Sequence, residues 1–180
     1  ILESGRVVPT VNKKAGLQYE AGLCNSGTFS YVDRFDSPTL DMRWMYLRNP
    51  DLSAYNLGSN GLSIKASDAN IHEVKPITAV FRRQQHNTFT AETEVTFNPA
   101  SDKELAGFAL LQNEHYNFTF GKTKVGGRTA IVLTRAEKNN VVIGSKFLCE
   151  KCADRPVKLR IHGDGRYYDF SYSLDGTTWN

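Results

Sequence analysis

A strictly alternating stretch between Phe89 and Phe97 constrains the fold of this chain more than any other feature of its sequence. The two phenylalanines fall on one side of an extended chain, whereas Glu92 and Glu94 fall on the other. Because successive side chains of a β-strand point to opposite faces, this period of two predicts a strand with one buried and one solvated face. Such a strand requires a sheet that is packed against a second layer.

Further short strands are predicted along the chain, with turn residues between them and no long amphipathic helix. The predicted strands and hairpin arms cover residues 31–35, 44–47, 55–57, 62–65, 105–112, 115–122, 130–134, 141–143, 157–161 and 167–173. Turns that recur about every 8–12 residues are typical of β-sandwiches. The predicted fold is therefore all-β, a two-sheet antiparallel β-sandwich over residues 28–180, with one or two further strands expected after Asn180. Residues 1–27 lack periodicity and are predicted to be a linker from a preceding domain.

The composition is that of an ordinary globular domain. The chain has 180 residues, 40% hydrophobic content and a net charge of +3. It has no run of five or six like charges, which gives no support to a nucleic-acid or membrane-surface partner. It also has no apolar run near the roughly 18 residues of a membrane span. A first residue that is Ile rather than Met suggests a piece of a longer or processed protein.

Three cysteines are present, and two of them form a Cys149-x-x-Cys152 pair. This spacing is compatible with half of a zinc site, a redox pair, a local disulfide across a turn or two reduced thiols. A zinc site normally needs four ligands, and no second pair lies nearby. The pair also lacks the strand-to-helix setting of thioredoxins. A disulfide or two free thiols are therefore preferred, and Cys24 remains unassigned.

No established catalytic motif is present in the sequence. Glu92 and Glu94 share one face of the central strand, and a pair of carboxyl groups is what glycosidases use. The run Glu92-Thr93-Glu94-Val95-Thr96-Phe97, however, lacks the third acid of sandwich-fold glucanases. A solvated strand face is the preferred interpretation of this pair. The four histidines lie in unlike contexts, and no nucleophile elbow or metalloprotease motif accompanies them.

Two polar clusters are candidate contact sites for a ligand or a neighbouring domain. Guanidinium and amide groups offer planar, multi-donor hydrogen bonding to hydroxyl-rich ligands or carboxylates. Alternatively, the arginines brace loops by binding backbone carbonyls and local acids such as Asp41 and Asp51. The candidate residues are Trp44, Tyr46, Arg48, Asn49, Arg82, Arg83, Gln84 and His86.

Four motifs, in register, resemble one known domain. They are residues 35–44 with 47–50, residues 81–86, residues 106–109 with 112–114, and residues 170–179. Together they resemble the C-terminal β-sandwich of family 43 glycoside hydrolases, the β-xylosidases and α-L-arabinofuranosidases. The resemblance implies a concanavalin A-like jelly roll, in agreement with the strand pattern. The sequence departs from the family at Asn87, where an aromatic residue is usual.

The resemblance implies that this chain is a non-catalytic accessory domain of a xylosidase or arabinofuranosidase. In that family the catalytic carboxyl groups lie in a five-bladed propeller N-terminal to the sandwich, so no catalytic residue is assigned here. The implied partners are the chain's own catalytic propeller and xylo- or arabinoxylo-oligosaccharides, with a periplasmic or secreted location by analogy. No cofactor is expected. Calcium occurs in such sandwiches, but no acidic loop here has suitable spacing.

The alternative function is a lectin-like carbohydrate-binding module. Such a module presents exposed aromatic side chains on a concave sheet. Trp44 and Tyr167 are the candidates for that role.

Overall fold

The computed structural model describes residues 2–3, 6–7, 30–137 and 139–180. The contacts between residues divide the chain after Val32 into two units. In the first unit, β1 (Leu2–Glu3) pairs antiparallel with β2 (Arg6–Val7). Most of the predicted linker, and Cys24 within it, lies outside the described residues, so its linker role stays a prediction.

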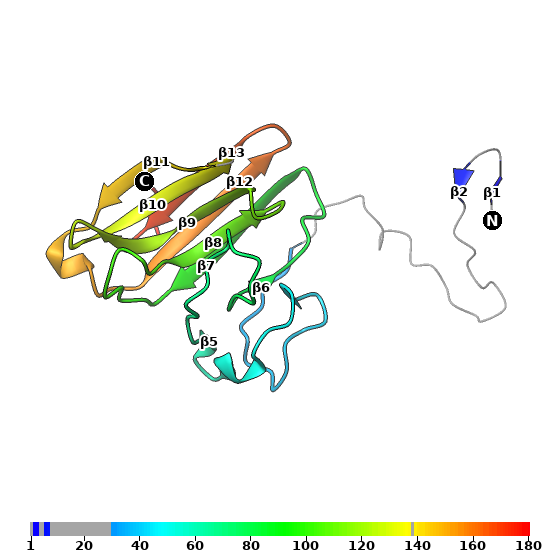
Figure 1. The fold of residues 1–180 in the computed structure, drawn as a ribbon, viewed down its shortest axis with the longest axis horizontal. Helices are drawn as coiled ribbons and strands as arrows, with labels where there is room; N and C mark the ends of the chain where they lie inside the picture. The colour runs from blue at the N-terminus through cyan, green and yellow to red at the C-terminus, as the bar shows by residue number, and fades with distance from the viewer. Residues whose placement is uncertain (1, 4–5, 8–29, 138) are drawn as a thin grey trace. The chain divides into compact units, whose positions relative to one another are not determined.

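The second unit contains the two antiparallel sheets that the alternating pattern predicted (Figure 1). The four-stranded sheet has the order β11-β10-β9-β8, and the three-stranded sheet has the order β13-β12-β7. The fold class is therefore confirmed as an all-β sandwich. The strands are β7 (Thr88–Val95), β8 (Ala106–Leu111), β9 (Tyr116–Val125), β10 (Arg128–Glu137), β11 (Asn139–Phe147), β12 (Val157–Asp164) and β13 (Tyr168–Ser173).

Shorter elements precede the sandwich, in the cyan and blue-green segment of Figure 1. β3 (Met45–Tyr46) pairs with β6 (Val80–Phe81), and β4 (Tyr55–Gly58) forms the predicted hairpin with β5 (Gly61–Ile64). Residues 30–137 and 139–180 include two 3-10 helices, η2 (Leu52–Ala54) and η3 (Glu150–Cys152).

The predicted strand at residues 31–35 is wrong. Phe35 adopts a left-handed backbone conformation, with φ of 54°. Its N–H group donates to the carboxylate of Asp33 at 2.8 Å, which closes a local turn. A residue in this conformation cannot continue a strand ladder, because the strand geometry requires a strongly negative φ.

The core lies between the two sheets. Phe120 and Ile131 from the four-stranded sheet contact the cluster formed by Val157, Leu159 and Tyr172 from the three-stranded sheet. The odd-numbered residues from Phe89 to Val95 are the less exposed ones along β7, whereas the even-numbered ones are exposed. The predicted alternation of the central strand is therefore confirmed, and β7 carries its two glutamates on the outer face of the sandwich.

Lys122 is a charged residue inside this sandwich. It lies opposite Ile131 across the β9–β10 ladder and has an exposed fraction of 0%. Its ammonium group donates to the backbone carbonyl of Arg155 at 3.0 Å. Burial lowers the pKa of Lys122 from its ordinary value, because the protonated form loses its hydration. The protonated lysine therefore reduces the stability of the folded state.

We expect Lys122→Met to raise the free energy of unfolding at pH 7 by about 1 kcal/mol, since replacing a buried ion with an apolar side chain of similar volume is often stabilising. In the unaltered chain, the unfolded state binds this proton more tightly, so stability should rise as the pH approaches the ordinary pKa of lysine. Urea unfolding at pH 7 and pH 10 measures both effects. A lower stability for Lys122→Met at pH 7, with exposed Lys103→Met as control, would contradict this prediction.

Cys149 and Cys152 form a disulfide with a Cα–Cα distance of 5.0 Å. The bond spans η3, and Cys152 packs against the core cluster. Of the two alternatives that the sequence left open, a local disulfide or two free thiols, the structure shows the disulfide, and this pairing excludes a zinc half-site in the oxidised chain. Among the residues that the structure describes, no three His, Cys, Asp or Glu side chains gather to hold a metal ion. None of the described helices is long and apolar enough to cross a bilayer.

Candidate functional site

The two predicted polar clusters lie at opposite ends of the short β3–β6 ladder. The two strands pair antiparallel, with Tyr46 opposite Val80. The chain therefore leaves β3 toward Arg48 and Asn49 at one end, and it leaves β6 toward residues 82–86 at the other. The fold thus divides the predicted candidates into two separate groups.

Trp44 and Tyr46 pack within the domain. The indole N–H of Trp44 donates to the carboxylate of Asp33 at 2.7 Å, and its ring lies 5.3 Å from that of Phe35. The ring of Tyr46 meets that of Tyr55 edge-on, with centroids 5.0 Å apart. Both candidate aromatic rings are only partly exposed and take part in internal contacts.

Arg48 links the first loops of the domain to the β8–β9 turn. Its guanidinium forms an ion pair with Glu114 and donates to the backbone carbonyl of Lys75 at 2.7 Å. Its own φ of 62° is left-handed, which is unusual for a residue with a Cβ atom and is held only where surrounding contacts fix it. Asn49, the next residue, is exposed. The geometry of Arg48 agrees with the loop-bracing alternative, although its acidic partner is distant in sequence.

Asn117 supports the same turn from inside the sheet. It is 4% exposed, and its amide nitrogen donates to the backbone carbonyls of Asn113 and Glu114, both at 3.1 Å. His72 Nδ1 lies 3.2 Å from the carbonyl of Glu114. Glu114, His72 and Asn117 were not predicted from the sequence as parts of one site. The Gln112-Asn113-Glu114 motif and the predicted hairpin arms at residues 105–112 and 115–122 pointed to this turn, but not to its partners.

The ion pair predicts a specific dependence of stability on pH. A hydrogen bond from its own backbone N–H and the nearby Arg48 hold the pKa of Glu114 below its ordinary value. The ionised carboxylate therefore stabilises the folded state above the ordinary pKa of glutamate, about 4.3. This contribution is lost as the pH falls through the lowered value.

We expect Glu114→Gln to lower the melting temperature at pH 7, and we expect the difference from the unaltered chain to shrink below about pH 4. Differential scanning calorimetry from pH 3 to pH 7 measures both. Glu150→Gln is the control, because Glu150 is exposed and forms no ion pair with another residue that the structure describes. A difference that is constant with pH would contradict this account of Glu114.

The second group of candidates, residues 82–86, follows β6 on the way to β7. Arg83 and Gln85 are exposed, and Arg82 and His86 are partly buried. The amide of Gln84 donates to the carbonyl of His86 at 3.0 Å and accepts the hydroxyl of Tyr168 at 3.1 Å. The segment is thus connected to β13 of the sandwich.

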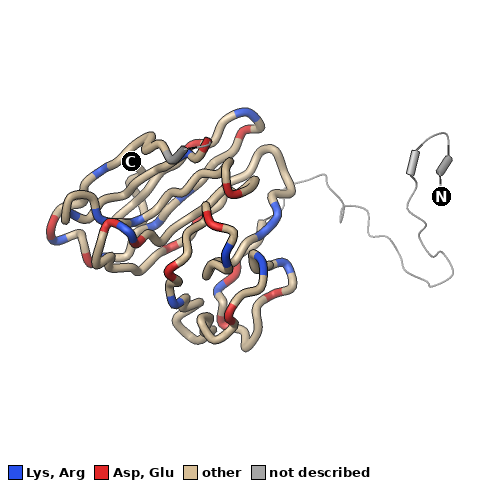
Figure 2. The backbone as a smooth tube through the Cα atoms, in the orientation of Figure 1, with Lys and Arg blue, Asp and Glu red and all other residues tan. Residues whose placement is uncertain are grey.

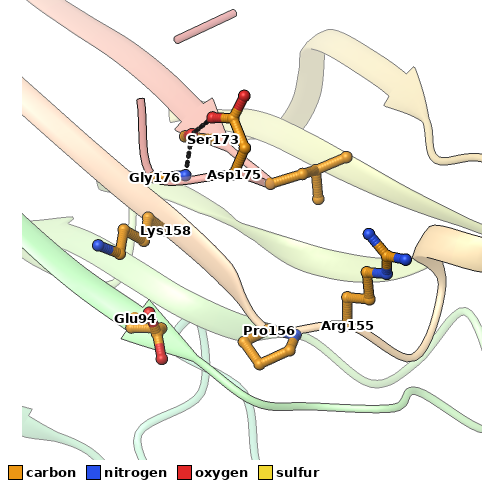
Figure 3. A pocket seen from close by; sticks show the side chains of 8 residues that line it. Glu94, Arg155, Pro156, Lys158, Ser173, Asp175 and Gly176 are labelled. Atoms are coloured by element: carbon orange, nitrogen blue, oxygen red, sulfur yellow. Dashed lines mark hydrogen bonds between the residues drawn. The ribbon is translucent and has the colours of Figure 1, made fainter. Parts of the chain in front are cut away.

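A shallow pocket of about 350 Å³ lies where β12 begins and β13 ends (Figure 3). Lys158 and Glu94 approach it from neighbouring strands, and Arg155 lies on its other side. Asp175 closes the turn after β13: it accepts the hydroxyl of Ser173 at 3.0 Å and two backbone N–H groups. These donors hold the pKa of Asp175 far below its ordinary value. Its carboxylate is therefore committed to the turn rather than to chemistry.

Next to the pocket, an aromatic ring lies over an ion pair on the outer face of the three-stranded sheet. Arg160 Nε donates to Glu92 at 2.7 Å, and the guanidinium lies 3.5 Å from the centroid of the Trp179 ring. The prediction that Glu92 and Glu94 are solvated is confirmed, since both are exposed. The stack of Trp179 on Arg160 was not predicted from the sequence. Figure 2 shows basic and acidic positions interspersed along the described backbone.

Known proteins with related sequence and structure share this domain. A curated xylan 1,3-β-xylosidase from a Vibrio species is 32% identical over 108 residues, 56% of this chain and 19% of that protein. The non-reducing end α-L-arabinofuranosidase BoGH43B of Bacteroides ovatus is 27% identical over 112 residues, 61% of this chain and 21% of that protein. The chain therefore spans only about a fifth of either of these curated relatives.

A solved structure has the same fold. The crystal structure of a GH43_12 retrieved from a capybara gut metagenome matches with a TM-score of 0.74 and 32% identity, over 83% of this chain and 29% of that chain. The model of the β-xylosidase C-terminal concanavalin A-like domain matches residues 32–180. The resemblance that the four motifs predicted is thereby confirmed. This chain belongs to the family of β-xylosidase C-terminal concanavalin A-like domains found in GH43 enzymes.

Proposed function

We propose that this chain is the non-catalytic accessory domain of a glycosidase that releases xylose or arabinose from xylan or arabinoxylan fragments. Its membership of the GH43 C-terminal domain family is the observation that carries the proposal. The names of the related proteins support xylosidase or arabinofuranosidase activity for the parent polypeptide. In this proposal, the domain packs against the catalytic domain of its own chain and supports it.

The state of the two strand glutamates supports a non-catalytic role. A glycosidase needs one carboxyl group that keeps its proton in an apolar setting and another that acts across the substrate. Glu92 is instead held by Arg160 at 2.7 Å on an exposed sheet face. Glu94 is its neighbour on the same exposed face. Neither has the apolar surroundings of a general acid.

An apolar strip on the edge strand β11 is a suitable contact for a catalytic domain. Because consecutive strand residues alternate between faces, this contact would be made by the edge of the sheet and not by one of its faces. Val141, Val142 and Ile143 are consecutive and have exposed fractions of 49%, 61% and 52%. They lie on an edge strand, where exposed apolar residues promote association with another surface. We assign this strip, residues 141–143, to the contact with the parent's catalytic domain.

The first experiment measures hydrolysis of aryl β-D-xyloside and aryl α-L-arabinofuranoside by the 180-residue chain and by the full-length polypeptide. The full-length polypeptide is expected to hydrolyse one or both, and the chain alone is expected to hydrolyse neither. Activity of the chain alone that is abolished by Glu92→Gln would overturn the proposal.

The second experiment introduces Val142→Asp into the full-length polypeptide. A charge in the strip should shorten the half-life of activity at elevated temperature, because the contact between the domains would bury it unpaired. The melting temperature of the 180-residue chain should not change, since this side chain is exposed there. Val74→Asp is the matched control, because Val74 is 80% exposed and stands alone. Equal half-lives for both variants would contradict the assigned contact.

A further inference from the structure

The outer face of the three-stranded sheet carries polar side chains only. Every second residue of β12 faces outward, and Arg160, for example, lies between Glu92 of β7 and Ser171 of β13. We call this surface the polar face. Its members are Thr88, Thr90, Glu92, Glu94, Lys158, Arg160, His162, Asp164, Asp169 and Ser171. Ser173, which follows in the same register on β13, is buried.

Trp179 is the aromatic residue that lies over this face. Glu92 fixes the guanidinium of Arg160 through its Nε, and that guanidinium in turn fixes the indole ring at 3.5 Å. Asn180 exchanges both of its backbone hydrogen bonds with Tyr172, so the segment that bears Trp179 is also held at β13. The ring is only partly buried. It is therefore an oriented aromatic platform on a polar sheet, held in place before any ligand binds.

The chemistry of the polar face disfavours two classes of partner, a second protein surface and a polyanion. Protein interfaces have cores that are depleted of charged residues, and this face offers no aliphatic side chain to bury. A polyanion such as nucleic acid would meet Glu92, Glu94 and Asp169 as well as the cations. Alternating donors and acceptors around one aromatic ring instead suit a neutral ligand that has many hydroxyl groups.

The dimensions favour an extended ligand. From the row of His162 to the row of Lys158 the sheet spans four residues along β12, about 13 Å at the usual rise of a strand. Thr90 Oγ1 lies 3.0 Å from His162 Nδ1 at one end of this span, and the 350 Å³ pocket lies at the other. This length corresponds to a short oligosaccharide rather than to a single sugar.

We propose that the polar face binds a linear, neutral, β-linked oligosaccharide. One sugar ring stacks on Trp179, because sugar rings present C–H groups on one face and hydroxyls around the edge. The remaining N–H groups of Arg160 donate to hydroxyl groups, and the carboxylate of Glu94 accepts from them. The polar face is distinct from the β11 strip, so one domain has a sugar-binding sheet and a separate protein-binding edge.

The test is isothermal titration of the 180-residue chain with xylohexaose and with maltohexaose. The choice of a xylan-derived probe rests on the proposed function, but the existence of the polar face does not. Xylohexaose is expected to bind saturably with a dissociation constant in the millimolar range, about −4 kcal/mol, and more tightly than maltohexaose, whose α-linked chain curves away from a flat sheet. Trp179→Ala should weaken that binding about tenfold or more, as expected for loss of a stacking contact of about 1.4 kcal/mol.

Phe147→Ala is the matched control. The Phe147 ring also stacks on an arginine, Arg128, with 4.4 Å between guanidinium and ring centroid, but it lies on the other sheet. The Phe147→Ala variant should bind xylohexaose as tightly as the unaltered chain does. Glu92→Gln keeps the shape of the side chain and provides a second variant if Trp179→Ala fails to fold. Absence of saturable binding by the folded chain, preference for maltohexaose, or equal weakening in the Trp179 and Phe147 variants would overturn the proposal. None of these outcomes bears on packing against the catalytic domain, which the full-length polypeptide tests separately.

Discussion

Replacing Gly121 with alanine is expected to lower the free energy of unfolding by about 3 kcal/mol or more, which is the upper range for overpacking a close contact. Gly121 pairs with Gly107 across β8 and β9. A Cβ atom on Gly121 would lie 2.3 Å from the backbone oxygen of Ala106 and 3.1 Å from the Cα of Gly107. Because both obstacles are backbone atoms, a side-chain rotation cannot relieve the clash, and the two strands would have to separate.

Gly144→Ala is the matched control for this prediction. Gly144 also lies in a strand of the four-stranded sheet, but a Cβ atom there would meet no atom within 4 Å. Its replacement should leave stability unchanged or raise it slightly, since alanine reduces the entropy of the unfolded chain. Urea unfolding at 25 °C measures both variants. Equal stability of the two variants would contradict this prediction, because it would show that the close approach of β8 and β9 leaves room for a Cβ atom at position 121.

Local periodicity predicted most of the sandwich, because one buried face leaves a period of two in the sequence. The alternations in β7 and β12, and the hairpin turn at residues 58–61, each have a cause within a few residues. The strand predicted at residues 31–35 failed because a left-handed Phe35 leaves no trace in hydrophobic pattern. β10 and β11 run longer than predicted, because their pairing continues beyond the apolar runs into polar residues such as Arg135 and Lys146.

The candidate site was less predictable, because its contacts join residues that are far apart in sequence. Arg48 and Glu114 are 66 residues apart, and Glu92 and Arg160 are 68 apart. The sequence identified Arg48 by its residue type and its motif, but nothing local to Arg48 indicated its acidic partner. Trp179 was part of a resemblance motif, yet its stack on Arg160 depends on where the turn after β13 places it.

The exposure of the strip on β11 could not be predicted from the sequence either. A run such as Val141-Val142-Ile143 in a sequence favours a buried strand. In the fold, β11 is the edge strand of its sheet, so these three side chains remain accessible. Periodicity identifies which residues form strands, whereas the order of strands in a sheet decides which of them lie at an edge. Strand order depends on long-range pairing, which a local pattern does not report.

Leu159→Ala is expected to lower the free energy of unfolding by about 3–4 kcal/mol, within the range for emptying a fully buried leucine site. Leu159 has an exposed fraction of 0% and belongs to the cluster that joins the two sheets. It lies on the central strand of its sheet, between Thr93 of β7 and Tyr172 of β13. Hydrogen bonds to β7 and β13 on both sides of β12 leave the neighbouring residues little freedom to fill the space of the lost methyl groups. The free-energy cost of the remaining cavity therefore adds to the cost of the lost apolar burial.

Leu52→Ala provides the comparison, because Leu52 is 62% exposed in η2 and should cost less than about 1 kcal/mol, as surface substitutions usually do. Urea unfolding followed by tryptophan fluorescence and by far-ultraviolet circular dichroism gives both values and checks that unfolding is two-state. A loss below about 1.5 kcal/mol for Leu159→Ala would mean that the two sheets can close over the vacated space. In that case the sandwich would be held mainly by its rim, including the disulfide at residues 149–152, rather than by the cluster between its sheets.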